Sequence, residues 1–525
     1  MQLQPVLISG EWKDAKKPSG KFNAVNPANK TVLAESYPVS GLDDINEMVE
    51  SGYDAAMQMV STSPDKISDF LCRFADNIEL ISEKLVELAN VETALPAEPR
   101  LRSVELPRTT NQLRQAAQAA KQRSWCHATI DTASNIRSKY GPIGGPVVVF
   151  GPNNFPFAFN SVAGGDFAAA IAAGNPVIAK ANTGHPGTTK LFAEAALKAV
   201  KQCGLHPATV QLIYRTAPTD GFKLISHPYT GATAFTGSKS AGLKLKDAAD
   251  RAGKPIYLEM SSINPIFILP GALAERSEDI AIELFGACSL GTGQFCTNPG
   301  LIIVLKNKES DNFINSLTKH FSQNKAGVLL TPSGPANIAA AIKILTDNGA
   351  EIIAGGKEIE GEGFSFENTL MRVDGGSFLR NPSSLQTEAF GTASLIVVAD
   401  DIQQMAAVAS KLEGNLTGSV YSDSKGKDDH SYIGIEAALR PKVGRLLNDK
   451  MPTGVAVVPS MNHGGPFPAT GHPGFTAVGL PASMLRFAAL QCYDNVRPHR
   501  LPVELRDTNP TGSMWRYIDG EWTQN

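Results

Sequence analysis

The stretch 146–180, PVVVFGPNNFPFAFNSVAGGDFAAAIAAGNPVIAK, decides the fold because two kinds of pattern alternate in it. An apolar run at 146–151 ends in glycine, an alanine-rich run at 157–174 ends in another glycine, and 175–180 is apolar again. Short apolar runs separated by a helical stretch are typical of a βαβ unit, whose strands pair in parallel. We therefore predict a strand, a helix over 157–174 and a second strand.

The same alternation continues along the chain. Apolar runs at 209–214, 230–237 and 255–260 are each separated by helical patterns, and a second alternating region runs from NPIFIL at 264–269 to GVAVVPS at 454–460. The first 125 residues show the three- and four-residue apolar spacing of helices. The sequence thus predicts an α/β protein with two parallel sheets.

A five-residue echo links the two ends of the chain. ISGEW at 8–12 and IDGEW at 518–522 share a Gly-containing turn and a tryptophan. As structure, this similarity predicts two related hairpins at sheet edges.

Composition narrows the function classes. The chain has 525 residues, 42% hydrophobic and 19% charged, and a formal net charge of −3. No basic stripe is present, so we expect neither nucleic acid nor an anionic membrane as a partner. The longest apolar tract, 157–179, carries polar residues such as Asp166, which argues against a membrane span.

The six cysteines lie far apart and form no CxxC pair. This usage predicts free thiols in a reducing compartment and no zinc or other metal site. The first residues show neither the basic nor the apolar region of a secretory signal, so the expected location is the cytoplasm.

Chemistry-bearing residues follow several predicted strands directly. Asn154, Lys180 and Glu259 stand at or just after three strand ends, and Gly237 with Ser238 opens a helix after another. Carboxyl ends of parallel strands share one edge of a sheet, where ligands bind next to helix N-termini. One amide, one ammonium, one helix start and one carboxylate therefore face the same edge.

Cys296 lies in GTGQFCTNPG, 291–300, after a stretch at 281–290 that predicts a buried helix. A cysteine nucleophile needs an exposed thiolate and a donor that stabilises the oxyanion formed on attack. Asn154 can supply that donor, and Gly291 and Gly293 let the chain approach a ligand closely. No histidine is required if a carboxylate activates water. His463 and His472 are interpreted as residues of a Gly- and Pro-rich loop.

Six motifs in their order resemble the aldehyde dehydrogenase superfamily over about residues 1–500. They are GPNNFPF, NPVIAK, FTGS, YLEMSSINP, GTGQFCT and TEAFG. The run from 151 to 189 is most similar to bacterial 2,5-dioxopentanoate (α-ketoglutaric semialdehyde) dehydrogenases, near NADP-linked fatty-aldehyde dehydrogenases. The resemblance implies oxidation of an aldehyde to an acid through a cysteine thioester, with a nicotinamide cofactor.

The resemblance also implies roles for the matching residues. Cys296 resembles the nucleophile, Glu259 the general base, Asn154 the oxyanion donor and Lys180 a contact to cofactor ribose and active-site charge. The implied cofactor-binding set is Phe150, Gly151, Pro152, Asn153, Lys180, Asn182, Thr183, Gly221, Gly237, Ser238, Glu259, Glu388 and Phe390.

Thr183 bears on the choice of cofactor. Relatives that use NAD often carry a glutamate three residues after the lysine, and here that position is Thr183. Without this carboxylate a 2′-phosphate meets no like charge. The expected cofactor is NADP, with NAD as the alternative.

Two substrate classes remain open. A keto-acid semialdehyde needs a cation for its carboxylate, and Arg102, Arg108 and Arg114 are candidates, with Arg108 preferred. A medium- or long-chain aldehyde needs an apolar tunnel, for which the sequence offers Phe155, Phe159 and Phe295.

Two other classes of protein with this resemblance are an acylating dehydrogenase and a catalytically silent homologue. An acylating enzyme that uses coenzyme A would lack a water base, whereas Glu259 is present. A catalytically silent homologue with a binding or structural role would carry lesions at the nucleophile or amide, and Cys296 and Asn154 are intact.

The resemblance implies the fold of the family: two Rossmann-like parallel-sheet domains plus a small oligomerisation arm, assembled as a homodimer or homotetramer. The expected parts are a dinucleotide-binding domain at 1–128 and 145–260, a catalytic domain at 261–460, an arm and tail at 129–144 and 485–525, and a loop bordering the active site at 461–484.

Overall fold

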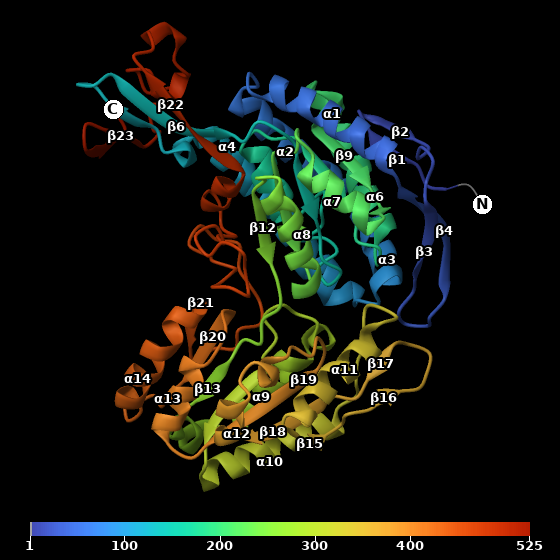
Figure 1. Ribbon diagram of the computed structural model, residues 1–525, viewed down its shortest axis with the longest axis vertical. Coiled ribbons are helices and arrows are strands. Elements are labelled where there is room, and N and C mark those ends of the chain that lie inside the picture. Colours follow the sequence, from blue (N-terminus) through green and yellow to red (C-terminus); the bar gives the residue numbers. More distant parts are fainter. Residues whose placement is uncertain (1–2) are drawn as a thin grey trace.

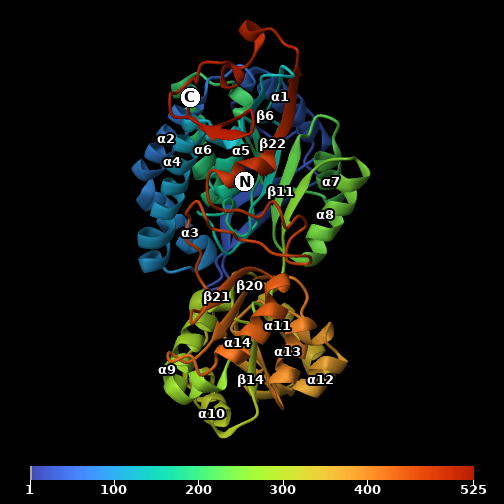
Figure 2. The ribbon, with the colours of Figure 1, turned by 90° about the vertical axis from the view of Figure 1, so that its left-hand side faces the viewer.

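The computed structural model describes residues 3–525 as two α/β lobes and a projecting β-arm (Figures 1 and 2). In both views one lobe lies above the other, and the arm extends from the upper lobe. The α/β fold with parallel sheets, predicted from the sequence, is confirmed. Among the described residues no helix is long and apolar enough to cross a membrane.

The first lobe is built on a seven-stranded sheet in which β7 marks a reversal of strand order. From β7 the chain moves outward to β8 and β9 on one side and returns to β11 and β12 on the other. Such a switch point opens a crevice at the carboxyl ends of the strands. In sheet order the strands are β12 (Ile256–Glu259), β11 (Ala232–Thr236), β7 (Val147–Phe150), β8 (Val177–Lys180), β9 (Val210–Ile213), β1 (Val6–Ile8) and β2 (Glu11–Lys13).

The helix predicted over 157–174 is shorter than expected. Helix α5 covers only Gly165–Ala172, and the residues before it form turns. The Glu105 carboxylate accepts the backbone N–H groups of Phe157 and Ala158, both at 2.9 Å. A buried side chain from another helix thus binds donors at the start of the predicted helix, so the prediction was wrong there.

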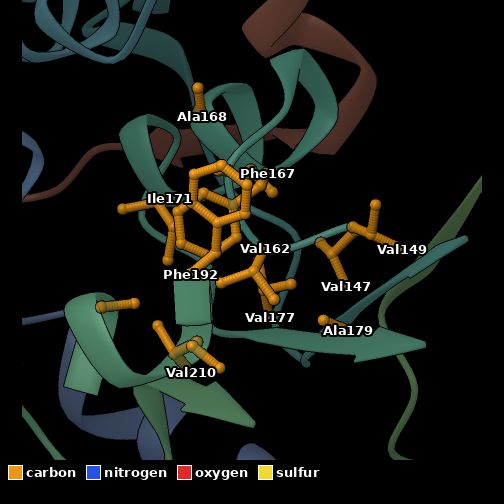
Figure 3. Close-up of a cluster of buried hydrophobic side chains, with 14 of the residues drawn as sticks. Val147, Val149, Val162, Phe167, Ala168, Ile171, Val177, Ala179, Phe192 and Val210 are labelled. Carbon is orange, nitrogen blue, oxygen red and sulfur yellow. The ribbon is translucent and has the colours of Figure 1, made fainter. Parts of the chain in front are cut away.

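The core of this lobe lies between the sheet and its helices (Figure 3). Val147, Val177 and Val210 of three neighbouring strands and Phe167 of α5 are fully buried. Phe192 of α6 packs against the same cluster. The helices of the lobe are α1 (Leu42–Met59), α2 (Pro64–Leu80), α3 (Ser82–Thr93), α4 (Leu106–Gln122), α5, α6 (Pro186–Cys203), α7 (Pro218–Ser226) and α8 (Lys239–Arg251), and a π-helical segment, Ala97–Glu105, precedes α4.

A second seven-stranded sheet forms the other lobe. Its strands are parallel except the edge strand β15. In sheet order they are β15 (Glu351–Ala354), β18 (Thr369–Asp374), β19 (Ala393–Ala399), β14 (Leu301–Leu305), β13 (Ile266–Ile268), β20 (Asn415–Tyr421) and β21 (Val443–Asn448). The helices are α9 (Pro270–Ser289), α10 (Lys308–Gln323), α11 (Gly334–Asp347), α12 (Gly375–Arg380), α13 (Ile402–Ser410) and α14 (Asp429–Leu439).

Two expectations fail in this lobe. The segment 281–290 is half exposed rather than buried, because only one stripe of α9 faces the core and Ile282 is 52% exposed. The apolar run at 454–460 forms no strand, because β21 already occupies that edge of the sheet and the run alternates in exposure along the surface.

The arm is a five-stranded sheet ordered β22–β6–β5–β23–β24. Its strands are β5 (Thr129–Asp131), β6 (Ile136–Pro142), β22 (Ala488–Asp494), β23 (Arg516–Ile518) and β24 (Glu521–Thr523). The remaining short strands are β3 (Gly20–Val25), β4 (Val32–Ser40), β10 (Arg215–Thr216), β16 (Glu358–Ile359) and β17 (Ser365–Phe366).

The hairpin echo is confirmed. Leu7 pairs with Trp12 in the β1–β2 hairpin, and Tyr517 pairs with Trp522 in the β23–β24 hairpin. Each hairpin ends its sheet. Both turns have two consecutive residues at positive φ, the second of them glycine, as a type I′ turn requires.

Candidate active site

The carboxyl edge of the first sheet faces the amino edge of the second, since residues 260–265 join the end of β12 directly to β13. A pocket of about 460 Å³ lies at this edge. The predicted site residues that line it are Phe150, Gly151, Pro152, Asn153, Asn154, Phe155, Phe159, Lys180, Asn182, Gly237, Ser238, Glu259, Cys296, Glu388 and Phe390. Four predicted residues are outside its lining, namely Arg108, Thr183, Gly221 and Phe295.

Cys296 stands on a tight elbow between α9 and β14. Three consecutive residues, Gly291, Thr292 and Gly293, have φ between 57° and 70°. A Cβ at Gly293 would lie 2.1 Å from the carbonyl group of Gly391. Internal packing is therefore one physical reason for glycine at 293, and the expectation that these glycines also admit a ligand stays a prediction. The Asn264 side-chain amide donates to the Cys296 carbonyl at 2.9 Å and holds this turn in place.

His463, which the sequence interpretation treated only as a loop residue, lies next to Cys296 and Glu259. Its Nε2 lies 3.2 Å from Cys296 Sγ and 2.9 Å from Glu259 Oε1, and its side chain is buried. The contact to sulfur has hydrogen-bond geometry, whereas the contact to Glu259 has only ion-pair distance. A thiol, an imidazole and a carboxylate from three distant segments thus meet at one point.

The charges of this group influence one another. Burial disfavours the imidazolium, but the Glu259 carboxylate and the Cys296 sulfur outweigh it and raise the pKa of His463 to about 10. Burial raises the pKa of the Cys296 thiol, and the neighbouring His463 cation opposes that rise. His463 is therefore the group that makes ionisation of this buried sulfur easier.

Asn154 is held beside Cys296. Its side-chain amide donates to the Gln294 carbonyl at 2.8 Å, two residues before Cys296. Arg100 donates to the Asn154 carbonyl at 2.9 Å. Because an amide nitrogen carries two donor hydrogens, one remains for a ligand oxygen in the pocket that Asn154 and Cys296 both line.

A backbone hydrogen bond connects the turn at Gly237 to Glu259. The Gly237 N–H donates to the Glu259 carbonyl at 3.1 Å, and the Ser238 hydroxyl accepts the Ala241 N–H as the cap of α8. The first-turn N–H groups of α8 stand at the pocket that Ser238 lines, where an anion would be stabilised.

Lys180 ends β8 in this pocket. Burial, together with the smaller effect of the Arg215 charge, lowers the pKa of Lys180 to about 8. Arg215 is exposed on β10, the short strand that follows β9 in the chain. Thr183 is in the loop that follows β8, outside the pocket lining, and Gly221 is on α7 away from it.

Glu388 lies across the pocket with Phe390. Burial raises the pKa of Glu388 to about 7, while the Ser261 hydroxyl and the Ser262 N–H oppose the rise. Residues of the second lobe that the sequence interpretation did not include also line the pocket. They are Gln294, Thr331, Ser333, Gly334 and Asn337.

The three candidate arginines differ in whether their guanidinium groups already have a partner. Arg102 is bound to Glu83 at 2.7 Å and Arg114 to Glu79 at 2.6 Å, both in surface ion pairs, so neither is free for a substrate carboxylate. In the described part of the chain, Nε and Nη2 of Arg108 are buried and have no hydrogen-bond partner. Of the three, only Arg108 presents an unpaired guanidinium.

Aromatic rings connect Arg108 to the pocket. Its guanidinium lies 5.1 Å from the ring centre of Phe159 and 5.8 Å from that of Phe155. Phe159 in turn lies 5.8 Å from the His463 ring. Phe295 packs behind Phe155 at 5.0 Å and belongs to a small buried cluster rather than to the pocket lining.

Comparisons with known proteins agree with this geometry. Residues 12–437 match the aldehyde dehydrogenase family. The chain is 37% identical to α-ketoglutaric semialdehyde dehydrogenase 2 of Azospirillum brasilense over 99% of this chain and 100% of that protein, and 34% identical to the α-ketoglutaric semialdehyde dehydrogenase of Acinetobacter baylyi over 99% and 98%. The fold is similar to that of an aldehyde dehydrogenase C mutant of Pseudomonas syringae solved with NAD+ and octanal, with a TM-score of 0.79 and 21% identity, covering 95% of this chain and 98% of that one.

Proposed function

The chain belongs to the aldehyde dehydrogenase family, and from this premise we propose that it oxidises α-ketoglutaric semialdehyde to 2-oxoglutarate with NADP as the preferred acceptor. It is an NAD(P)-dependent aldehyde oxidoreductase. The substrate is proposed because the two full-length relatives are α-ketoglutaric semialdehyde dehydrogenases and because one structural observation fits their substrate.

That observation is the unpaired guanidinium of Arg108. A buried cation without a partner is costly, and a carboxylate is the ligand that offsets the cost. Arg108 lies over Phe155 and Phe159, which both line the pocket of Cys296. A keto-acid semialdehyde carries its carboxylate at the end opposite the reacting carbonyl, so the thiol and Arg108 would bind its two ends. A long aliphatic chain would leave this charge unpaired.

The chain's own residues account for the steps at sulfur. The Cys296 thiol gives its proton to solvent water while the neighbouring His463 imidazolium stabilises the thiolate, and the thiolate attacks the aldehyde carbon. The free N–H of the Asn154 amide stabilises the resulting oxyanion. After oxidation the substrate is a thioester on Cys296. Glu259 then takes a proton from water, the hydroxide attacks the thioester carbon, and the acid leaves as the thiolate is restored.

The pocket fits a nicotinamide dinucleotide. The start of α8 suits a diphosphate, Lys180 and Asn182 suit the adenosine ribose, and Glu388 and Phe390 suit the nicotinamide end. When bound, this cofactor supplies the acceptor for the hydride that the aldehyde loses. Thr183 in place of a carboxylate, together with the cations of Lys180 and Arg215, supports a preference for the 2′-phosphate of NADP.

Assembly and cellular location stay predictions. The β-arm ends in β22, an edge strand whose Leu490 is 63% exposed. Such an edge favours pairing with a second copy in a homodimer or homotetramer. Cytoplasmic location and the assigned domain boundaries are predicted from the sequence alone.

Steady-state kinetics with both cofactors test the proposal. We expect kcat/KM for the semialdehyde to exceed that for an unbranched aldehyde of equal length, with NADP better than NAD and no stimulation by coenzyme A. In Arg108→Leu, KM for the semialdehyde should rise at least about tenfold, the cost of losing one charge-assisted contact, with little change for the uncharged aldehyde. Arg102→Leu, at a surface ion pair, is the matched control. An equal effect of Arg108→Leu on both aldehydes would refute the carboxylate assignment.

A further inference from the structure

The meeting point of Cys296, His463 and Glu259 has a second chemical property. The sulfur, a ring nitrogen and a carboxylate oxygen all lie within 4.8 Å of one another. Among residues 3–525 no other group of three such side chains comes together in this way. We propose that these three side chains form a binding site for Zn²⁺, and that the bound ion reversibly inhibits the enzyme.

The donor set suits this ion. Thiolate, imidazole and carboxylate are the three protein ligands of zinc. Tetrahedral zinc with bonds of about 2.0–2.3 Å places its donor atoms roughly 3.4–3.6 Å apart. Here Sγ and Nε2 are 3.2 Å apart, and Nε2 and Oε1 are 2.9 Å apart. Each spacing needs to open by only about half an ångström, which small side-chain rotations supply.

All three donors are held by the surrounding backbone. The Cys296 carbonyl is bound by Asn264, and the Glu259 carbonyl by Gly237. The His463 N–H donates to the Thr476 carbonyl at 3.0 Å and keeps the loop in register. An ion would thus meet ligands that are already in place and would not have to order a flexible segment.

The fourth coordination position faces open space. Cys296 and Glu259 line the large pocket, which leaves room for a water molecule on the ion. Three protein ligands and one water are the usual arrangement of zinc sites that remain accessible. The protons on sulfur and nitrogen leave to solvent as the metal bonds form, so no further reactant is needed.

The consequence for the enzyme follows from which groups the ion occupies. The same ion would hold the nucleophile and the base of the proposed mechanism. Inhibition should therefore be competitive with the aldehyde and reversed by a chelator. The spacing of the cysteines in the sequence predicted no metal site. It could not indicate this one, because the three ligands lie 37 to 204 residues apart in the chain.

Equilibrium dialysis of the full-length enzyme against Zn²⁺, with the bound metal measured by atomic absorption, tests the site. We expect one ion per chain in the wild type. Cys296→Ser and His463→Asn should bind it about 100-fold more weakly, since each loses a metal ligand. His472→Asn is the matched control, because His472 is an exposed histidine of the same loop outside the donor set.

Cobalt provides a direct view of the sulfur bond. The wild type with Co²⁺ should show a thiolate-to-metal charge-transfer band that Cys296→Ser lacks, while circular dichroism checks that the variant is folded. Equal Zn²⁺ binding in wild type and His463→Asn, or a band that survives Cys296→Ser, would overturn the proposal. Because dialysis requires no turnover, a wrong substrate assignment would leave this result unchanged.

Discussion

Replacing His463 by asparagine should raise the pKa of the Cys296 thiol. Asparagine keeps a donor of similar size near the sulfur but removes the positive charge. At 3.2 Å and an effective dielectric constant of about 20, two unit charges interact by roughly 5 kcal/mol. If the asparagine donor and solvent recover about half of this energy, roughly 2.7 kcal/mol remains, which corresponds to about a 100-fold smaller fraction of thiolate at neutral pH.

The assay is the rate of alkylation of Cys296 by iodoacetamide as a function of pH. The His463→Asn profile should shift to higher pH, and the rate at pH 7 should fall about 100-fold. The pH profile of kcat/KM should shift with it, so activity partly returns in alkali. His472→Asn should match the wild type. If the alkylation profile of His463→Asn coincided with that of the wild type, the proposed effect of the imidazolium would be refuted.

Four other outcomes follow from the site. Asn154→Ala should slow NADPH formation in stopped-flow by about 100-fold, because one oxyanion donor contributes about 3 kcal/mol; an unchanged rate would remove Asn154 from the mechanism. Glu259→Gln should give one burst of NADPH per active site and a thioester visible by mass spectrometry, and continued turnover at the wild-type rate would dismiss it as the base. Thr183→Glu should raise KM for NADP at least about tenfold with little effect on NAD, because the added carboxylate repels the 2′-phosphate. The Lys180 ammonium, with its pKa lowered to about 8 by burial, loses its charge as the pH rises through that value, so KM for NADP should rise above pH 8 in steady-state assays and stay level below it.

The sequence predicted well whatever depends on local pattern. The apolar runs that became β7 and β8 carry their own periodicity, and the residues at their ends, Phe150 and Lys180, reach one pocket because parallel strands share an edge. The predicted start of the helix that became α5 was wrong, because Glu105, about 50 residues earlier in the chain, accepts a hydrogen bond from the backbone of Phe157. The sequence around residue 157 contains no pattern that indicates such a distant contact.

His463 shows the same limit within the site. It lies 167 residues from Cys296 in a loop without periodicity, so nothing beside it in the sequence indicates its partner. The glycines before Cys296 are expected from the sequence to admit a ligand, and the structure adds a reason that the sequence did not indicate, since the Gly391 backbone approaches Gly293. Residue type was readable from the sequence, and the identity of the neighbour was not.

The contact between Gly293 and Gly391 also bears on how such an enzyme can diversify. Gly391 directly follows Phe390, so the loop of Cys296, the proposed nucleophile, and the loop of Phe390, proposed to lie beside the nicotinamide, touch main chain to main chain, without space for a methyl group. In the proposed mechanism, the separation between the substrate bound to Cys296 and the nicotinamide is therefore set by the backbone and not by the side chains that select the substrate. Selection can exchange those side chains for new aldehydes and leave the transfer distance intact.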